Sequence, residues 1–192
     1  GGNGNWKNSS GKGFMQNDWA SYTTNGSTQN VTGNCLVSVE AYNGYNEIGS
    51  SSRNNKGGNA DGISVKHRAS NTTIIDAHAH HNSDDGFDFW KGGRDAPNPT
   101  IRVFYSSANY NGKDNGDGNG YKFGSGSEDK GSRLIYGSAA CNNKNNGFDS
   151  NGTQTDIYAF TCDAYGNWQE DIFRMSCGHV VDKFALNCSM FE

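Results

Sequence analysis

One short pattern occurs five times in this chain of 192 residues. Each copy is an apolar run that leads to an alanine, and an asparagine follows within three positions. The copies occupy residues 35–44, 74–82, 103–112, 134–143 and 157–167. The matching alanines are Ala41, Ala79, Ala108, Ala140 and Ala164, spaced 38, 29, 32 and 24 residues apart. A chain with an irregular repeat of this size is expected to fold as a stack of similar units.

A second pattern follows the earlier copies. It is Asp-Gly or Asn-Gly followed by an apolar residue, after which the residues alternate between the two faces of a strand. Such a pattern is typical of a strand that leaves a turn with one face buried. It occupies residues 60–66, 85–90, 119–124 and 146–149. Because no helical periodicity separates these strands, the sequence predicts an all-β solenoid with few coils. An immunoglobulin-like sandwich is the competing all-β fold, but it does not predict aligned repeats.

The chain length fits one domain, 1–192. Residues 1–30 carry little periodicity and are expected to form an irregular N-terminal cap, and residues 31–192 are expected to form the coils. Small alanines at one matched position suit an inward-facing site at a tight corner, and the asparagine after each suits a stacked turn.

Composition limits the partners and the location of the protein. A net charge of −4 and a pI near 5.7 argue against nucleic acid as a partner, and no apolar run has transmembrane length. Five cysteines without C-x-x-C spacing fit two disulfides and one free thiol, and six sites match the N-glycosylation pattern. We expect a secreted, monomeric glycoprotein with no membrane partner.

The acidic stretch 82–90 places Asp84, Asp85 and Asp88 within five residues. Carboxylates this close repel one another unless a cation lies between them, and calcium prefers such oxygen ligands. The alternative is a solvated acidic turn. In a solenoid, matched positions of successive coils stack about 4.8 Å apart, so Asp61, Asp85 and Lys122 are expected to line one strip of the surface.

Four carboxylates from Asp61, Asp84, Asp85 and Asp88 are enough to hold calcium. An acidic polysaccharide offers its own carboxylate to such an ion, and the coordination makes the neighbouring C5 proton more acidic. Lys122 is the candidate base, provided that its amine is neutral. Loss of the 4-linked leaving group then gives an unsaturated product by β-elimination.

Three segments carry a resemblance to a known family. They are Ala-Asp-Gly at 60–62, Asn-Ser-Asp-Asp-Gly-Phe-Asp at 82–88, and Asn-Gly-Asp-Gly-Asn-Gly-Tyr-Lys-Phe-Gly at 115–124. In order and spacing they resemble the family 9 polysaccharide lyases, the group of pectate lyases and exopolygalacturonate lyases. The resemblance implies a right-handed parallel β-helix with Ca²⁺ on Asp61, Asp84, Asp85 and Asp88, and Lys122 as the Brønsted base.

Other residues near these segments have two interpretations. Lys66, Arg68, Lys91 and Arg94 are predicted to contact substrate carboxylates, or else they are ordinary solvated charges. His78 and His80 could belong to a transition-metal site, but no third ligand is apparent.

Two other functions stay open. Because the chain is shorter than the family's catalytic domains, one alternative is a non-catalytic, calcium-stabilised β-helix that binds carbohydrate, as an adhesin or effector does. The other is a glycoside hydrolase, which needs two catalytic carboxylates at a suitable separation.

Overall fold

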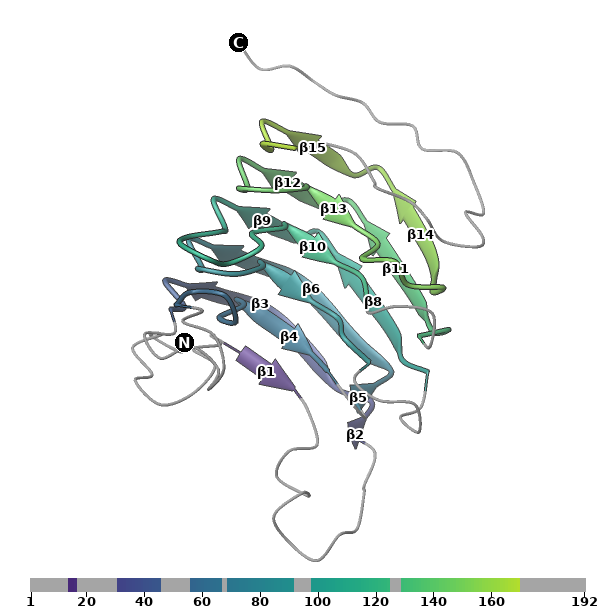
Figure 1. Cartoon of the computed structure of the whole chain (residues 1–192). Helices are drawn as coiled ribbons and strands as arrows, with labels where there is room; N and C mark the ends of the chain where they lie inside the picture. Colours follow the sequence, from purple (N-terminus) through teal and green to yellow (C-terminus); the bar gives the residue numbers. More distant parts are fainter. Residues whose placement is uncertain are drawn as a thin grey trace, which may run out of the picture.

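Short parallel strands make up the regular structure of this protein (Figure 1). The computed structural model describes residues 14–16, 31–45, 56–66, 69–91, 98–124 and 129–169. The strands in these ranges are β1 (Phe14–Gln16), β2 (Val31–Thr32), β3 (Cys35–Tyr42), β4 (Ile63–Val65), β5 (Ala69–Ser70), β6 (Thr72–His80), β7 (Phe87–Asp88), β8 (Thr100–Phe104), β9 (Ser107–Asn109), β10 (Tyr121–Lys122), β11 (Ser132–Tyr136), β12 (Ala139–Cys141), β13 (Phe148–Asp149), β14 (Asp156–Phe160) and β15 (Asp163–Tyr165).

The strands stack coil upon coil in chain order, as Figure 1 shows. One sheet has the order β1-β4-β7-β10-β13, and a small one pairs β2 with β5. A larger sheet has the order β14-β11-β8-β6-β9-β12-β15, with β3 also paired to β6. The two halves of β6 pair with β8 and β9 respectively, so one long strand is continued in later coils by two strands and a bend. Every pairing is parallel, which confirms the predicted β-helix.

The repeated alanines form one column in the interior. Ala41 pairs with Ala79, Ala79 with Ala108, Ala108 with Ala140, and Ala140 with Ala164. All five are buried, as predicted from their alignment. Side chains are small here because the glycines before β4, β7 and β10 lie against Ala79, Ala108 and Ala140 so closely that a Cβ on the glycine would be 2.8–2.9 Å from the alanine Cβ.

Aromatic rings fill the core behind the five-stranded sheet. Phe87 of β7 stacks on Tyr121 of β10 with a centroid distance of 4.5 Å, and Tyr121 stacks on Phe148 of β13 at 5.0 Å. The Asp/Asn-Gly motifs place these rings in register, so the predicted alternation after each turn is confirmed. The core therefore fixes which residues of this sheet face outward.

An asparagine ladder closes the corner after the alanine column. The Nδ2 of Asn82 donates to Oδ1 of Asn111 at 3.0 Å, Asn111 to Asn143 at 3.0 Å, and Asn143 to Asn167 at 2.9 Å. The second hydrogen of each amide goes to an alanine carbonyl in the adjacent coil, as from Asn111 to Ala79. Each amide both donates and accepts, so the ladder and the adjacent backbone groups satisfy its buried polar atoms.

One charged side chain lies in the apolar interior. Arg133 of β11 takes the inward position that Ile101 and Ile157 occupy in the neighbouring coils, and it is fully buried. Its guanidinium donates to Oδ2 of Asp129 at 2.7 Å and to the backbone carbonyl of Phe89 at 3.2 Å. Burial lowers the pKa of Arg133 from its ordinary value, and the carboxylate of Asp129 partly offsets this.

The described cysteines correct the disulfide prediction. Cys35, Cys141 and Cys162 take part in no disulfide, so the prediction of two disulfides is wrong. Cys141 on β12 is in register with Tyr42, three strand spacings or about 14 Å away, and Cys35 lies at the other end of β3, so Cys35 and Cys141 are beyond disulfide reach. Cys162 is buried with its Sγ 3.3 Å from the carbonyl of Phe160. The remaining Cys177 and Cys188 lie outside the described residues.

The predicted N-terminal cap is described only in part. Within residues 1–30, the structure describes β1, which pairs in parallel with β4. The division into a cap and coils of one domain therefore stays a prediction. Across the described ranges, no helix has the length and apolar character needed to cross a bilayer.

Candidate metal and catalytic site

The acidic site begins with a second column of turn residues. Asp61, Asp85, Asn119 and Asn146 precede the glycines that lead into β4, β7, β10 and β13. Asn146 Nδ2 donates to Asn119 Oδ1 at 3.2 Å, and Asn119 Nδ2 donates to Asp85 Oδ1 at 2.9 Å. Asp85 thus takes a place in an amide ladder. Because its carboxylate only accepts, the run of amide donors ends there.

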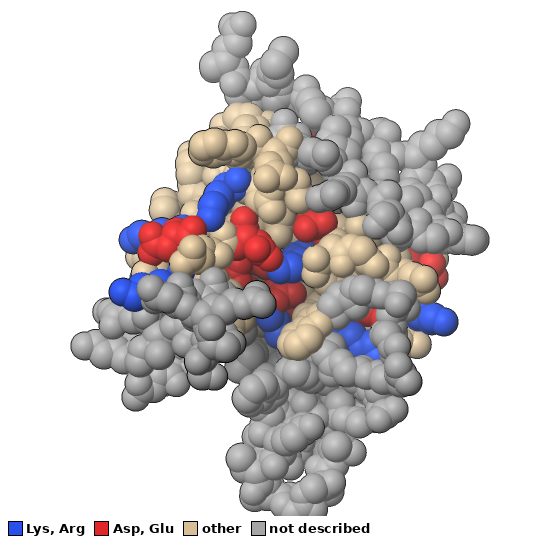
Figure 2. All heavy atoms as spheres, in the orientation of Figure 1, with Lys and Arg blue, Asp and Glu red and all other residues tan. Residues whose placement is uncertain are grey.

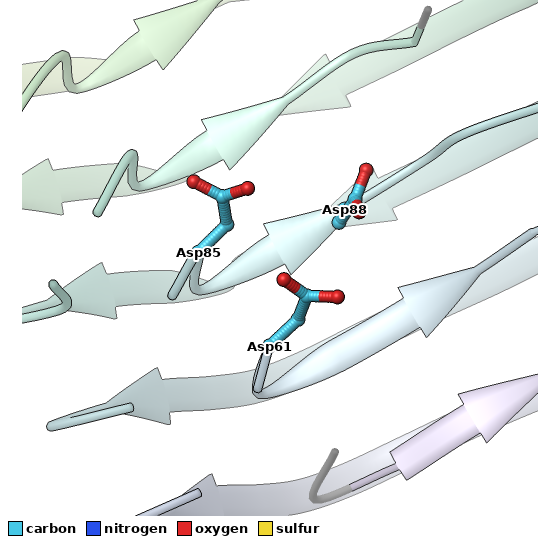
Figure 3. Close-up of side chains that lie close together, drawn as sticks. All are labelled: Asp61, Asp85 and Asp88. Carbon is cyan, nitrogen blue, oxygen red and sulfur yellow. The ribbon is translucent and has the colours of Figure 1, made fainter. Parts of the chain in front are cut away.

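Asp88 joins this column from β7. It pairs in register with Ser64 below and with Lys122 above, and it lies between the inward-facing Phe87 and Phe89. Its side chain therefore points out of the core, as predicted, yet only 5% of the residue is exposed. Carboxylate oxygens of Asp61, Asp85 and Asp88 lie within 4.8 Å of one another, and Figure 3 shows the three side chains converging from two coils.

Asp84 belongs to a second group that shares Asp85. Oxygens of Asp84, Asp85 and Asp117 also lie within 4.8 Å of one another, and Asp84 Oδ1 accepts a hydrogen bond from the backbone N–H of Asp117 at 2.7 Å. The four predicted metal ligands therefore divide into two overlapping groups. Asp117 was assigned no role from the sequence; its position in Gly-Asp-Gly-Asn-Gly at 116–120 was the available signal.

Lys122 lies at the junction of the two groups. Its amine donates to Asp117 Oδ2 at 2.7 Å and lies 3.1 Å from Asp85 Oδ2, and its side chain is 15% exposed. Burial disfavours the charged amine, but the carboxylates of Asp85, Asp88 and Asp117 outweigh this and raise the pKa of Lys122. The amine faces the acidic cluster, as predicted, and it is charged in the metal-free protein.

Lys66 lies inside the first group, which consists of Asp61, Asp85 and Asp88. Its Nζ contacts Asp88 Oδ2 and is 3.1 Å from Asp61 Oδ2, with a side chain that is almost fully buried. Burial again disfavours the charged form, but Asp61 and Asp88 more than compensate and raise the pKa of Lys66. The residue predicted to bind substrate is therefore an internal counterion in this structure.

Two of the carboxyl groups resist ionisation. Burial, then the charges of Asp85 and Asp61, raise the pKa of Asp84 to about 9. Burial also raises the pKa of Asp85 to about 7; Lys122 opposes this shift and Asp61 and Asp88 add to it. Two lysines thus compensate the clustered carboxylates incompletely, and an additional cation would favour the ionised forms.

The donor set fits a hard divalent cation. Asp88 Oδ1 is buried and has no hydrogen-bond partner in the described part of the chain, so one oxygen of the first group is not otherwise engaged. Carboxylate oxygens are the ligands that Ca²⁺ prefers. Figure 2 shows acidic side chains gathered at the centre of this face, with basic ones among them.

The other predicted substrate contacts are only partly described. Lys91 is buried and engaged with neighbouring groups, and Arg68 and Arg94 lie outside the described residues. Trp90 is 40% exposed, and its ring centroid is 5.7 Å from the Lys66 amine. An aromatic surface therefore lies beside the acidic site.

The histidines form a separate cluster. His80 contacts Glu40 at 2.9 Å and His81 at 2.8 Å, and His78 contacts Ser107. Among the described residues, only the two aspartate groups bring three suitable ligand atoms together, so the histidine pair still lacks a third ligand.

Fold and site together define a class: parallel β-helix proteins that carry a cluster of carboxylates and lysines on one sheet. Within this class, the chain belongs to the family described as "Pel9A-like, right handed beta helix region", whose sequence model matches residues 5–180. The fold is thus a right-handed parallel β-helix, as predicted.

A solved structure supports the same assignment. The crystal structure of pectate lyase Pel9A is similar with a TM-score of 0.61 and 25% sequence identity over 73% of this chain. The match covers 34% of the Pel9A chain, so this chain spans about a third of that enzyme. No curated protein matches the sequence.

Proposed function

We propose that this protein is a secreted, calcium-dependent lyase that cleaves polygalacturonate or a related uronic-acid polymer by β-elimination. One observation carries the proposal: the amine of Lys122 lies beside a compact group of buried carboxylates on one sheet of the β-helix. The similarity to a pectate lyase supports the same reaction class.

Each residue of the proposed site has a distinct task. Asp61, Asp85 and Asp88 would hold the ion, with Asp84 contributing from the adjoining group. When bound, calcium would withdraw electron density from the uronate carboxylate and so acidify the C5 proton. Arg68 and Lys91 are the proposed contacts to other uronate carboxylates.

Lys122 must be deprotonated before it can act as the base. Lys122 accepts a proton only as a neutral amine, whereas its contacts with Asp85 and Asp117 favour the charged form. The proposal therefore requires Lys122 to lose its proton and its contact with Asp85 before it acts. Activity is expected to rise at alkaline pH.

The test is to incubate the protein with polygalacturonate and calcium and to follow the ultraviolet absorbance of the 4,5-unsaturated product. Lys122→Ala is expected to lower turnover by about 10³-fold or more and to leave calcium binding measurable by calorimetry. Lys130→Ala, which removes an exposed amine, is the matched control. Absence of product with several uronates over about pH 7 to 10 would exclude the lyase.

A second candidate is a calcium-stabilised β-helix that binds an acidic polysaccharide without cleaving it. Two observations favour it: the chain spans about a third of Pel9A, and the carboxylates around Lys122 raise its pKa. Retention of polygalacturonate on the protein, with no unsaturated product, would support binding alone.

A further inference from the structure

The two lysines of the acidic site differ in where their partners lie. Lys122 holds Asp85 from the first group, but its shorter contact is with Asp117, whose side chain is 59% exposed. Both partners of Lys66, Asp61 and Asp88, belong to the first group and are buried. Lys66 is therefore the cation placed inside that group, and Lys122 lies at its edge.

The Lys66 amine uses the oxygens that a metal ion needs. It contacts Oδ2 of both Asp61 and Asp88. A calcium ion that took these two Oδ2 atoms as ligands would need the space that the amine fills, since Ca²⁺ lies about 2.3–2.6 Å from its oxygen ligands. Two cations at that separation repel strongly in a buried site. The ion and the ammonium group therefore exclude each other.

We propose that Lys66 is a tethered cation that competes with divalent metal for Asp61 and Asp88. In the metal-free protein it compensates the two carboxylates, and metal binding expels it. The competition lowers the metal affinity of the site. The inference rests on the proposed function only in taking calcium as the metal.

The structure offers a position for the expelled amine. The ring of Trp90 lies 5.7 Å from Lys66 Nζ, and Trp90 is partly exposed at the surface. The amine lies over this ring already, so a lysine with a flexible four-carbon stem can leave the carboxylates, keep the cation–π contact and turn outward. The amine then faces the solvent side of the site, where an anionic sugar could bind it. Metal loading would thus create an anion-binding group.

The test is a calcium titration by calorimetry of the wild-type chain and of Lys66→Met, which keeps the apolar stem and removes the charge. We expect Lys66→Met to bind calcium at least tenfold more tightly. In chelator its Tm is expected to fall below that of the wild type, because Asp61 and Asp88 lose their counterion. Calcium is expected to restore the Tm.

Two further variants make the result specific. Lys66→Gln keeps a hydrogen-bond donor without the charge and is expected to tighten calcium binding in the same direction, so it serves if Lys66→Met does not fold. Lys130→Met removes an exposed positive charge outside the site and is expected to leave calcium affinity and Tm unchanged.

The outcomes separate this inference from the proposed function. Equal or weaker calcium binding in both Lys66 variants overturns the competition, even where the wild-type chain makes unsaturated product. Tighter binding in the variants supports the competition, even where the wild-type chain makes none. If neither the wild type nor the variants bind calcium, the competition is overturned, and the calcium-dependent lyase with it.

Discussion

Two columns of turn residues run up the same β-helix and differ mainly in one functional group. At one corner, Asn82, Asn111, Asn143 and Asn167 form a complete amide ladder. At the other, Asn146 and Asn119 continue into Asp85 and Asp61. An amide donates and accepts, so the first column is satisfied internally. A carboxylate only accepts, so the second column needs a cation, and the candidate site lies where the donors end.

The largest expected effect comes from placing a carboxylate in the amide ladder. Asn111→Asp removes the Nδ2 group that donates to Ala79 and Asn143, and it puts a buried charge beside two acceptor oxygens. Because the nearby amine of Lys144 is already bound to the carbonyls of Asp114 and Gly116, we expect the free energy of unfolding to fall by about 3–5 kcal/mol. Chemical denaturation measures this.

The control for that variant is Asn71→Asp, which makes the same change at an exposed turn. It is expected to alter the free energy of unfolding by about 0.5 kcal/mol or less. If Asn111→Asp were as stable as this control, the contrast between the two columns would be lost.

The reverse exchange is expected to have the next largest effect. Asp85→Asn extends the amide column downwards and removes the carboxylate that both acidic groups share. Calcium affinity is expected to fall by about 100-fold, which is about 2.7 kcal/mol. In chelator near pH 8, stability is expected to increase, because a buried charge is gone. Calorimetric titration measures the change in calcium affinity, and thermal melting measures the change in stability. Unchanged calcium affinity would contradict the assignment of Asp85 as a metal ligand.

The last expected effect is a pH dependence of the metal-free protein. The raised pKa values of Asp84, about 9, and Asp85, about 7, mean that ionisation costs the folded state more than the unfolded chain. The stability that these groups contribute is present below their ordinary pKa near ~4 and is lost as the pH rises through about 7 and about 9. Calcium affinity is expected to rise over the same interval, since the ion replaces protons.

Melting curves at a series of pH values, in chelator and in calcium, check this prediction. Asp85→Asn is expected to remove the part of the pH dependence near neutrality and to move the alkaline part to lower pH, because the charge of Asp85 helps to raise the pKa of Asp84. A metal-free Tm that increases steadily from acid to alkaline pH would contradict the buried, uncompensated carboxyls.

The sequence predicted the columns because strand alternation and repeat spacing place a residue on one face of one coil. This is how Ala79 and Ala108 were placed in one column and Asp88 beside Lys122. The same rule puts Lys66 on the outer face, two residues after Ser64. It does not say which carboxylate a long, flexible side chain reaches, so the counterion role of Lys66 was missed.

Residues in turns were harder to place. Asp84 and Asp117 meet because the segment around Gly116 lies against Ser83, where the carbonyl oxygen leaves no room for a Cβ. No periodicity encodes such a loop contact. The disulfide prediction failed for a related reason: a count of cysteines does not say which coils they occupy, and Cys35 and Cys141 lie in different coils and at different positions along their strands.

The buried Arg133 also has a consequence for folding. In a stack of coils this similar, a strand shifted by one residue would turn its inward side chains outward. A shift of β11 by one position would turn the guanidinium outward and leave Asp129 buried without its charged partner. This single ion pair therefore penalises misaligned stacks and helps select the one alignment in which the coils bring their acidic groups together.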